Sequence, residues 1–291
     1  MGTSVSTVKS SSLSNSGGNT SSMISSALTS NAAKREKHVK KKIDYATKTG
    51  VLNLADLTLK GTHTVWLELA APELITRIKT LDLSGNPLKA IPVEVYGLSN
   101  LKSLFLTNCQ LQYTNDILGL THLSKLKLDH NDLEIDKVRN LPVSVTLIDL
   151  SYNHLVGIPA TLSPLINLIS LDLNHNRIES IYGIEALVGL VTLNLDDNLL
   201  TELPESICIL VKLRKISLAR NRFTKNSVSR PGQQSIPAGL LENSEVDHID
   251  LTGNVSITKA DVLHFTGIER FMQRRQAIKD KNFQGGALSD V

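Results

Sequence analysis

The stretch LINLISLDLNHNRIES, residues 165–180, decides the fold. Its apolar and amide residues fit the pattern LxxLxLxxNxL at Leu168, Leu171, Leu173, Asn176 and Ile178. In LxL the two leucines point to one face of an extended strand and the residue between them to the other. The amide residue follows where the chain leaves the strand and backbone groups need partners. The stretch therefore predicts a short strand with one buried face, followed by a turn.

The pattern recurs along the chain at a nearly constant spacing. Its amide position falls at Asn86, Cys109, Asn131, Asn153, Asn176, Asn198, Asn221 and Asn254. Successive positions are 22 or 23 residues apart, except for a last interval of 33. A period of about 22 residues lies in the leucine-rich-repeat range of about 20 to 29. Since one repeat buries its leucines only against its neighbours, we expect an α/β leucine-rich-repeat solenoid with a parallel concave β-sheet.

Five segments follow from this pattern. Both ends of the solenoid need helical caps, because an open end exposes leucines. The segments are a disordered Ser-rich leader (1–33), a basic amphipathic cap helix (34–50), one degenerate and eight regular repeats (51–257), a C-terminal helical cap (258–281) and a flexible tail (282–291). The long last interval places a surface loop at Thr224 to Gly239.

The amide positions form a structural ladder. Their side chains are expected to satisfy buried backbone groups that would otherwise lack partners. We interpret Cys109 as a buried substitute in that ladder rather than as a reactive thiol.

The outward strand positions predict a binding face on the concave side. Its candidate residues are Asp82, Phe105, Lys127, Asp149, Tyr152, Asp172, His175, Asn194, Asp196, Asp197 and Arg220. Four of the aspartates form a central acidic track, and we expect the two aromatic residues to be exposed as partner anchors. The alternative is that a solvated face is polar in any case.

Catalytic motifs are missing from the sequence. It contains no GxxxxGK[ST], HExxH, GxSxG or CxxC pattern, and its histidines lack metal-ligand spacing. We therefore expect no catalytic residue, no metal and no cofactor. The two cysteines do not form the disulfide clusters of extracellular repeat proteins, and no apolar run reaches membrane-spanning length.

The first residues predict a lipid anchor. Met1, Gly2 and Ser6 fit the myristoylation pattern MGxxx[ST], with the lipid on Gly2. One myristoyl chain binds membranes only marginally, so a second signal is required. A basic run can supply it next to anionic lipid, at Lys34, Arg35, Lys37, Lys40, Lys41 and Lys42. We expect a cytoplasmic protein, peripheral on the inner face of a membrane.

Two segments near the ends carry a family resemblance. The opening Met1–Gly2, IDYATKTGVLNL (43–54) and FTGIERFMQRRQAIKDK (265–281) together resemble the family of leucine-rich repeat-containing protein 57. The resemblance implies a small cytosolic, N-myristoylated protein without known enzymatic activity. The phrase IESIYGIEAL (178–187) is instead similar to repeats of phosphatase-regulatory subunits.

Three functions remain open at this point. The first is a non-enzymatic adaptor, presumed monomeric, that binds a protein on its concave face and no small-molecule substrate. The second is a regulatory subunit of a protein phosphatase. The third is a nucleic-acid binder that uses the basic leader, which the acidic concave face and the lack of a nucleic-acid-binding module disfavour.

Overall fold

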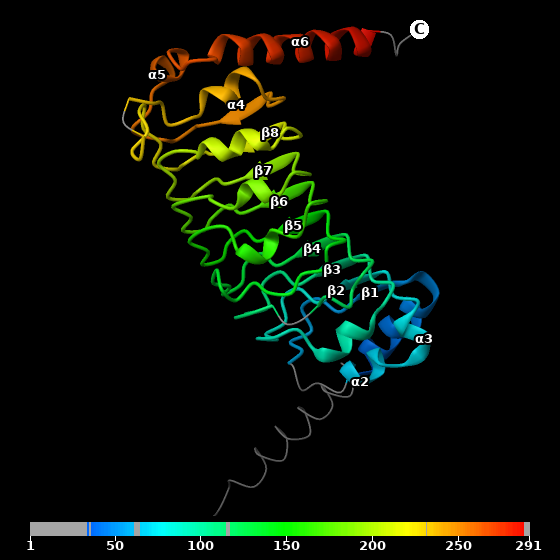
Figure 1. Ribbon diagram of the computed structural model, residues 1–291. Helices are drawn as coiled ribbons and strands as arrows, with labels where there is room; N and C mark the ends of the chain where they lie inside the picture. Colours follow the sequence, from blue (N-terminus) through cyan, green and yellow to red (C-terminus); the bar gives the residue numbers. More distant parts are fainter. Residues whose placement is uncertain (1–33, 35, 61–64, 115–116, 231, 288–291) are drawn as a thin grey trace, which may run out of the picture. The chain divides into compact units, whose positions relative to one another are not determined.

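The computed structural model describes residues 34, 36–60, 65–114, 117–230 and 232–287 (Figure 1). It consists of two units, residues 1–41 and residues 42–291. In the first unit, Lys34 and residues 36–41 are helical. The second unit contains all the repeats.

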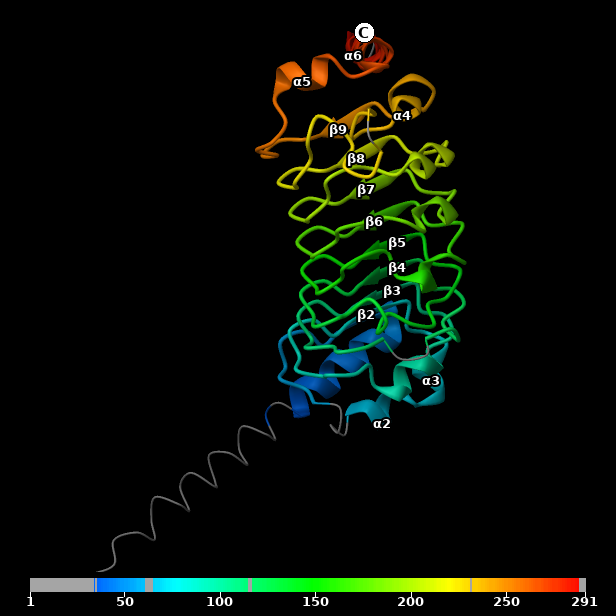
Figure 2. The same cartoon turned by 60° about the vertical axis from the view of Figure 1, so that its left-hand side comes forward.

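A single parallel sheet organises the second unit. Its nine described strands are β1 (Val51–Asn53), β2 (Thr80–Asp82), β3 (Ser103–Phe105), β4 (Lys125–Lys127), β5 (Leu147–Asp149), β6 (Ser170–Asp172), β7 (Thr192–Asn194), β8 (Lys215–Ser217) and β9 (His248–Asp250). They pair in sequence order from β1 to β9. Figure 2 shows them stacked one above another, with short helical segments along one side. The predicted α/β solenoid with a parallel sheet is confirmed.

The middle residue of each strand faces the core. From β1 to β8 these residues are at most 2% exposed: Leu52, Leu81, Leu104, Leu126, Ile148, Leu171, Leu193 and Ile216. They also face one another in the strand register, for example Leu171 with Leu193. Burying one such aliphatic side chain contributes about 1.5 to 3 kcal/mol, as an upper estimate. The core is therefore a continuous column that no repeat builds alone.

Short helices return the chain from one strand to the next. Three of the 3-10 segments begin directly after a proline, whose fixed φ suits a helix start: η1 (Val93–Gly97), η2 (Ala160–Leu162) and η4 (Glu205–Ile209). The others are η3 (Ile184–Ala186), α2 (Val65–Leu69), α3 (Pro72–Ile75) and α4 (Ala238–Glu242).

The ladder amides bond each repeat to the one before it. The Nδ2 group of Asn153 donates to the carbonyls of Leu150 and Ser151 in its own repeat and of Leu128 in the previous one, each at 3.0 Å. Its Oδ1 accepts the N–H of Leu133 at 3.0 Å. All eight ladder residues are at most 8% exposed. One side chain thus satisfies four backbone groups across two repeats.

Cys109 takes the ladder position of the second regular repeat with fewer bonds. Its Sγ lies 3.3 Å from the carbonyl oxygen of Leu83 and 3.6 Å from that of Thr107. Burial raises the pKa of this thiol to about 12. Since only a thiolate is a good nucleophile, Cys109 is chemically inert at neutral pH.

The two ends of the second unit are helical. At the N-terminal end, residues 42–49 are helical, Ile43 and Ala46 are buried, and Gly50 follows with a φ of 74°. At the C-terminal end, a reciprocal capping box between Thr258 and Asp261 starts α5 (Lys259–Leu263).

The long helix α6 (Ile268–Ala287) lies beyond β9 in both views (Figures 1 and 2). The sequence predicted a cap ending at residue 281 and a flexible tail from 282, but the helix continues to Ala287. Extending an existing helix adds a hydrogen bond per residue, and no proline interrupts this segment.

The segment Thr224 to Gly239 is more ordered than a plain surface loop. Asn226 and Gln234 form an antiparallel bridge, and α4 begins inside the segment at Ala238. The Glu202 carboxylate accepts hydrogen bonds from the backbone and hydroxyls of this segment, including the N–H of Val228 at 2.7 Å. The insertion is therefore fixed to the preceding repeat.

We expect Asn153→Ala to lower the free energy of unfolding by about 3 kcal/mol, because it leaves buried carbonyls and an N–H group without partners. Cys109→Ala should lower the free energy of unfolding by only about 1 kcal/mol, since a thiol is a weak hydrogen-bond donor. Urea denaturation followed by circular dichroism measures both. Equal losses would contradict this account of the ladder.

Candidate partner-binding face

The last residue of each strand forms what we call the strand column. Four of its members are aspartates whose Oδ1 accepts the backbone N–H two residues later: Asp82, Asp149, Asp172 and Asp250, at 2.9 to 3.2 Å. This contact closes the turn after the strand. Half of the predicted acidic track, Asp149 and Asp172, thus has a structural role that the sequence reading missed. The signal for it is Asp followed two residues later by Ser, Asn or Thr.

The residue directly before each ladder position forms a second set, the turn column. All its members have a positive φ: Gly85, Asn108, His130, Tyr152, His175, Asp197, Arg220 and Gly253. That conformation costs little for Gly, Asn or Asp, and more for bulky residues such as Tyr and Arg. The chain nevertheless places large side chains there in the central repeats.

Three rings of the turn column form a stack. The Tyr152 ring lies 4.0 Å from the His130 ring and 4.0 Å from the His175 ring, at interplanar angles of 14° and 13°. Stacking between aromatic rings contributes stability beyond the area that the rings bury. The stack joins three repeats into one continuous strip of ring edges.

Hydrogen bonds connect this stack to the sheet. Asn174 Nδ2 donates to Asp172 Oδ1 at 2.6 Å, and Asn174 Oδ1 lies 2.6 Å from His175 Nδ1. The Tyr152 hydroxyl lies 3.2 Å from His175 Nε2. These contacts link Tyr152, His175, Asn174 and Asp172 in one continuous chain of hydrogen bonds.

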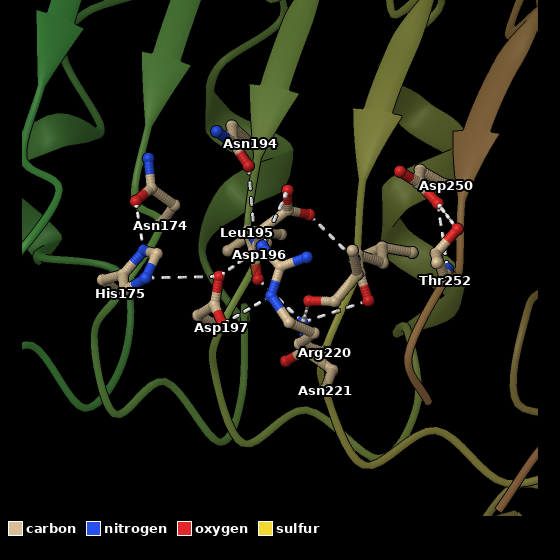
Figure 3. Close-up of polar contacts among 12 residues, drawn as sticks. Asn174, His175, Asn194, Leu195, Asp196, Asp197, Arg220, Asn221, Asp250 and Thr252 are labelled. Atoms are coloured by element: carbon tan, nitrogen blue, oxygen red, sulfur yellow. Dashed lines mark hydrogen bonds and ion pairs between the residues drawn. The ribbon is translucent and has the colours of Figure 1, made fainter. Parts of the chain in front are cut away.

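The C-terminal side of the stack ends in an ion pair (Figure 3). Arg220 donates to both carboxylate oxygens of Asp197, from Nε at 2.7 Å and from Nη2 at 2.6 Å. His175 Nε2 lies 3.5 Å from Asp197 Oδ2. The hydrogen bonds from Arg220 hold the pKa of Asp197 below its usual range, and Asp197 in turn raises the pKa of Arg220. Arg220 is therefore held in one direction although it is exposed.

Phe105 differs from the expectation that it is exposed. Its side chain is half-buried, whereas Tyr152 is 42% exposed. Lys125 on the next strand reaches over it, with Nζ 5.3 Å from the centroid of the Phe105 ring. Lys127, on the same strand, pairs with Asp149 at 3.2 Å.

A hollow of about 240 Å³ opens on the sheet between β6 and β9. It is lined by Ser170, Leu171, Asp172, Thr192, Leu193, Asn194, Lys215, Ser217 and His248. Burial raises the pKa of Asp172, against hydrogen bonds from Asn174 that lower it. Asp196 does not line this hollow. Its Oδ1 accepts the N–H of Ala219 at 2.7 Å.

The predicted membrane contacts fall mainly outside the second unit. Gly2 and Arg35 lie outside the described residues. Lys34, Lys37, Lys40 and Lys41 are exposed in the first unit, while Lys42 donates to the carbonyl of Asn53 at 2.8 Å. In the described ranges, no helix is both long and apolar enough to span a bilayer, and no three His, Cys, Asp or Glu side chains are grouped to hold a metal.

Comparisons with known proteins agree with this architecture. A family model described as leucine rich repeat matches residues 76–133. No curated protein sequence matches the chain.

Solved structures were also compared. An internalin from Listeria monocytogenes superposes with a TM-score of 0.55 at 18% identity, over 77% of this chain and 66% of that one. The leucine-rich-repeat ectodomain of the receptor kinase GASSHO1/SCHENGEN3 from Arabidopsis thaliana, solved in complex with CASPARIAN STRIP INTEGRITY FACTOR 2, gives a TM-score of 0.44 at 27% identity. It is matched over 69% of this chain and 26% of that one. The family-model match over residues 76–133 and the fold shared with the internalin agree with a leucine-rich-repeat solenoid.

Proposed function

We propose that the chain is a non-enzymatic adaptor that binds a protein partner through its concave face. The observation that carries the proposal is the stack of His130, Tyr152 and His175 at positive φ. Bulky residues rarely adopt a positive φ, and such residues are found most often at binding sites. There the free-energy cost of the backbone conformation is offset by function. Here the three positive-φ positions hold three aromatic side chains in a row.

The chemistry of the row fits a protein interface. Tyr152 combines a large apolar ring with a hydroxyl, as partner anchors commonly do, and its neighbours hold it in one orientation. A side chain that is ordered before binding loses little entropy on complex formation. Asp197 and Arg220 continue the row with a fixed ion pair that favours one partner orientation.

We expect Tyr152→Asn to weaken partner binding by about 1 to 4 kcal/mol, the usual effect of losing an aromatic anchor. Asparagine suits this backbone, since Asn108 occupies the equivalent position two repeats earlier. The matched control is Tyr182→Asn, which removes a tyrosine that is 69% exposed beside η3, away from the strands.

Affinity purification with quantitative mass spectrometry, followed by calorimetry on the purified partner, measures the effect. Partners retained by the Tyr182 variant and lost by the Tyr152 variant support the proposal. Equal binding by all three proteins would place the interface elsewhere. Recovery of a phosphatase catalytic subunit among the lost partners would favour the phosphatase-regulatory alternative.

We also propose that the leader tethers the protein to the cytoplasmic face of a membrane. The support is the myristoylation pattern at Gly2 together with Lys37, Lys40 and Lys41, which are exposed on one helical segment. Each basic residue next to anionic lipid contributes about 1 kcal/mol, which supplements one marginal acyl chain.

We expect Gly2→Ala to shift the protein from the membrane fraction to the soluble fraction. Replacing Lys37, Lys40 and Lys41 with Gln should release it in part and make the remaining membrane binding less dependent on salt. Changing Lys89, Lys102 and Lys212 to Gln removes the same charge from the repeats and serves as the control. A Gly2→Ala protein as membrane-bound as the wild type would contradict the lipid anchor.

A further inference from the structure

The concave face changes character along the sheet. On β3 to β5 most outward residues are large, among them Phe105, Lys125 and Lys127. On β6 to β8 most are small and polar, such as Ser170, Thr192 and Ser217, and Lys215 is the exception. The hollow of about 240 Å³ lies over the strands with small residues. It therefore results from a change in side-chain size on an otherwise regular sheet.

The charge of Asp172 in this hollow is not needed for the fold. Asp172 Oδ1 closes its turn by accepting the N–H of Asn174 at 3.0 Å. In the next repeat the equivalent residue is Asn194, whose Oδ1 accepts the N–H of Asp196 at 3.1 Å. A neutral amide thus closes the same turn. The second oxygen of Asp172 accepts the Nδ2 group of Asn194 at 3.2 Å, but the turn itself does not require the negative charge.

Neighbouring carboxylates are paired with cations, but Asp172 is not. Lys127 lies 3.2 Å from Asp149, and Arg220 contacts Asp197 at 2.6 Å. Asp172 accepts only from amides, those of Asn174 and Asn194, and no ion pair to it occurs in the described part of the chain. A partly buried carboxylate without a cation is destabilising, as the raised pKa of Asp172 reflects.

We propose that the hollow receives a single cationic side chain, arginine or lysine, from the protein partner, which pairs with Asp172. This inference rests on the proposed function of the concave face and names the chemistry of its ligand. Hydroxyls of Ser170 and Thr192, which are hydrogen-bonded to each other at 2.8 Å, line the same space and offer further acceptor oxygens. A guanidinium, with five donors in a planar fork, matches this acceptor set better than an ammonium.

The far side of the hollow limits it to one cation. Lys215 and His248 lie at its β8 and β9 side, two and three strands from Asp172. A second basic residue of the partner at that side would meet Lys215. The hollow thus selects an isolated basic residue with a neutral or acidic neighbour, rather than a run of basic residues.

Hydrogen bonds couple the hollow to the aromatic stack. Asn174 donates to Asp172 and contacts His175, which contacts Tyr152. A cation on Asp172 and an apolar group on the stack are therefore parts of one footprint. A partner segment that crosses both elements would place its basic residue over β6 and β7.

The test uses short synthetic peptides rather than the unidentified partner. Acetyl-Gly-Gly-Arg-Gly-Gly-amide is titrated into the full chain, and the side-chain amide of Asn194 and the backbone amide of Thr192 are followed by NMR. We expect saturable shifts with a dissociation constant on the order of millimolar, since one charged contact carries the binding. The same peptide with lysine in place of arginine should bind more weakly. The same peptide with citrulline, which lacks the positive charge, should not bind measurably.

Two matched variants separate this site from general electrostatics. Asp172→Asn preserves the turn, as Asn194 shows. It should lower the affinity for the arginine peptide by about tenfold or more. Asp82→Asn removes the same charge at the same register position on β2 and should leave the affinity unchanged. Proper folding of both variants is verified by their amide spectra.

The outcomes distinguish this inference from the proposed function. If the wild type shows no shifts, or both variants lose binding equally, the cation site is wrong even when Tyr152→Asn still abolishes partner binding. If Tyr152→Asn leaves the partner bound while the peptide binds through Asp172, the interface proposal fails and the cation site stands. Selective loss in Asp172→Asn supports the cation site.

Discussion

The buried amide of the ladder is the contact on which the rest of the structure depends. In a strand of three residues, too few backbone groups are paired to hold one turn of the solenoid on the next. The ladder side chain supplies the missing bonds at the point where the chain leaves the sheet, and it spans two repeats. Because each group is buried, losing one bond costs more than making it contributes in water. The ladder therefore fixes both the order and the register of the strands.

The ladder also determines the geometry of the binding face. By bonding to the carbonyls two and three residues earlier, as Asn176 does to Asn174 and Leu173, it closes a tight turn. The residue before the ladder position then adopts a positive φ in every regular repeat. Neighbouring parallel strands lie about 4.8 Å apart, which is close to ring-stacking distance. Aromatic residues placed at that position in successive repeats consequently stack, as His130, Tyr152 and His175 do.

The sequence was sufficient to predict the sheet, because the repeat period and the LxL alternation are local patterns with one structural solution. It was not sufficient to predict how outward residues contact one another. The stack of Tyr152 on two histidines depends on backbone conformation in three repeats, and the contact of Lys125 with the Phe105 ring depends on side-chain direction. The end of α6 was missed for a different reason, since no proline stops the helix and it continues through Gly285 and Gly286, residues that commonly end helices.

The role of charge on the concave face follows from comparing equivalent positions rather than from counting acidic residues. Asp82, Asp149, Asp172 and Asp250 all close turns, so an acidic track arises partly from turn chemistry. Asn194 shows that an amide closes the same turn without a charge. The charge, unlike the oxygen that accepts the N–H, is therefore free to be used for recognition. At Asp149 and Asp197 the carboxylate is already paired with a basic residue of the chain, Lys127 or Arg220. There the carboxylate orients that basic side chain. Asp172 has no such neighbour, and its negative charge lies beside a hollow bordered on the far side by Lys215. The face thus presents opposite charges at the two sides of one depression, which favours a partner in a single direction along the sheet.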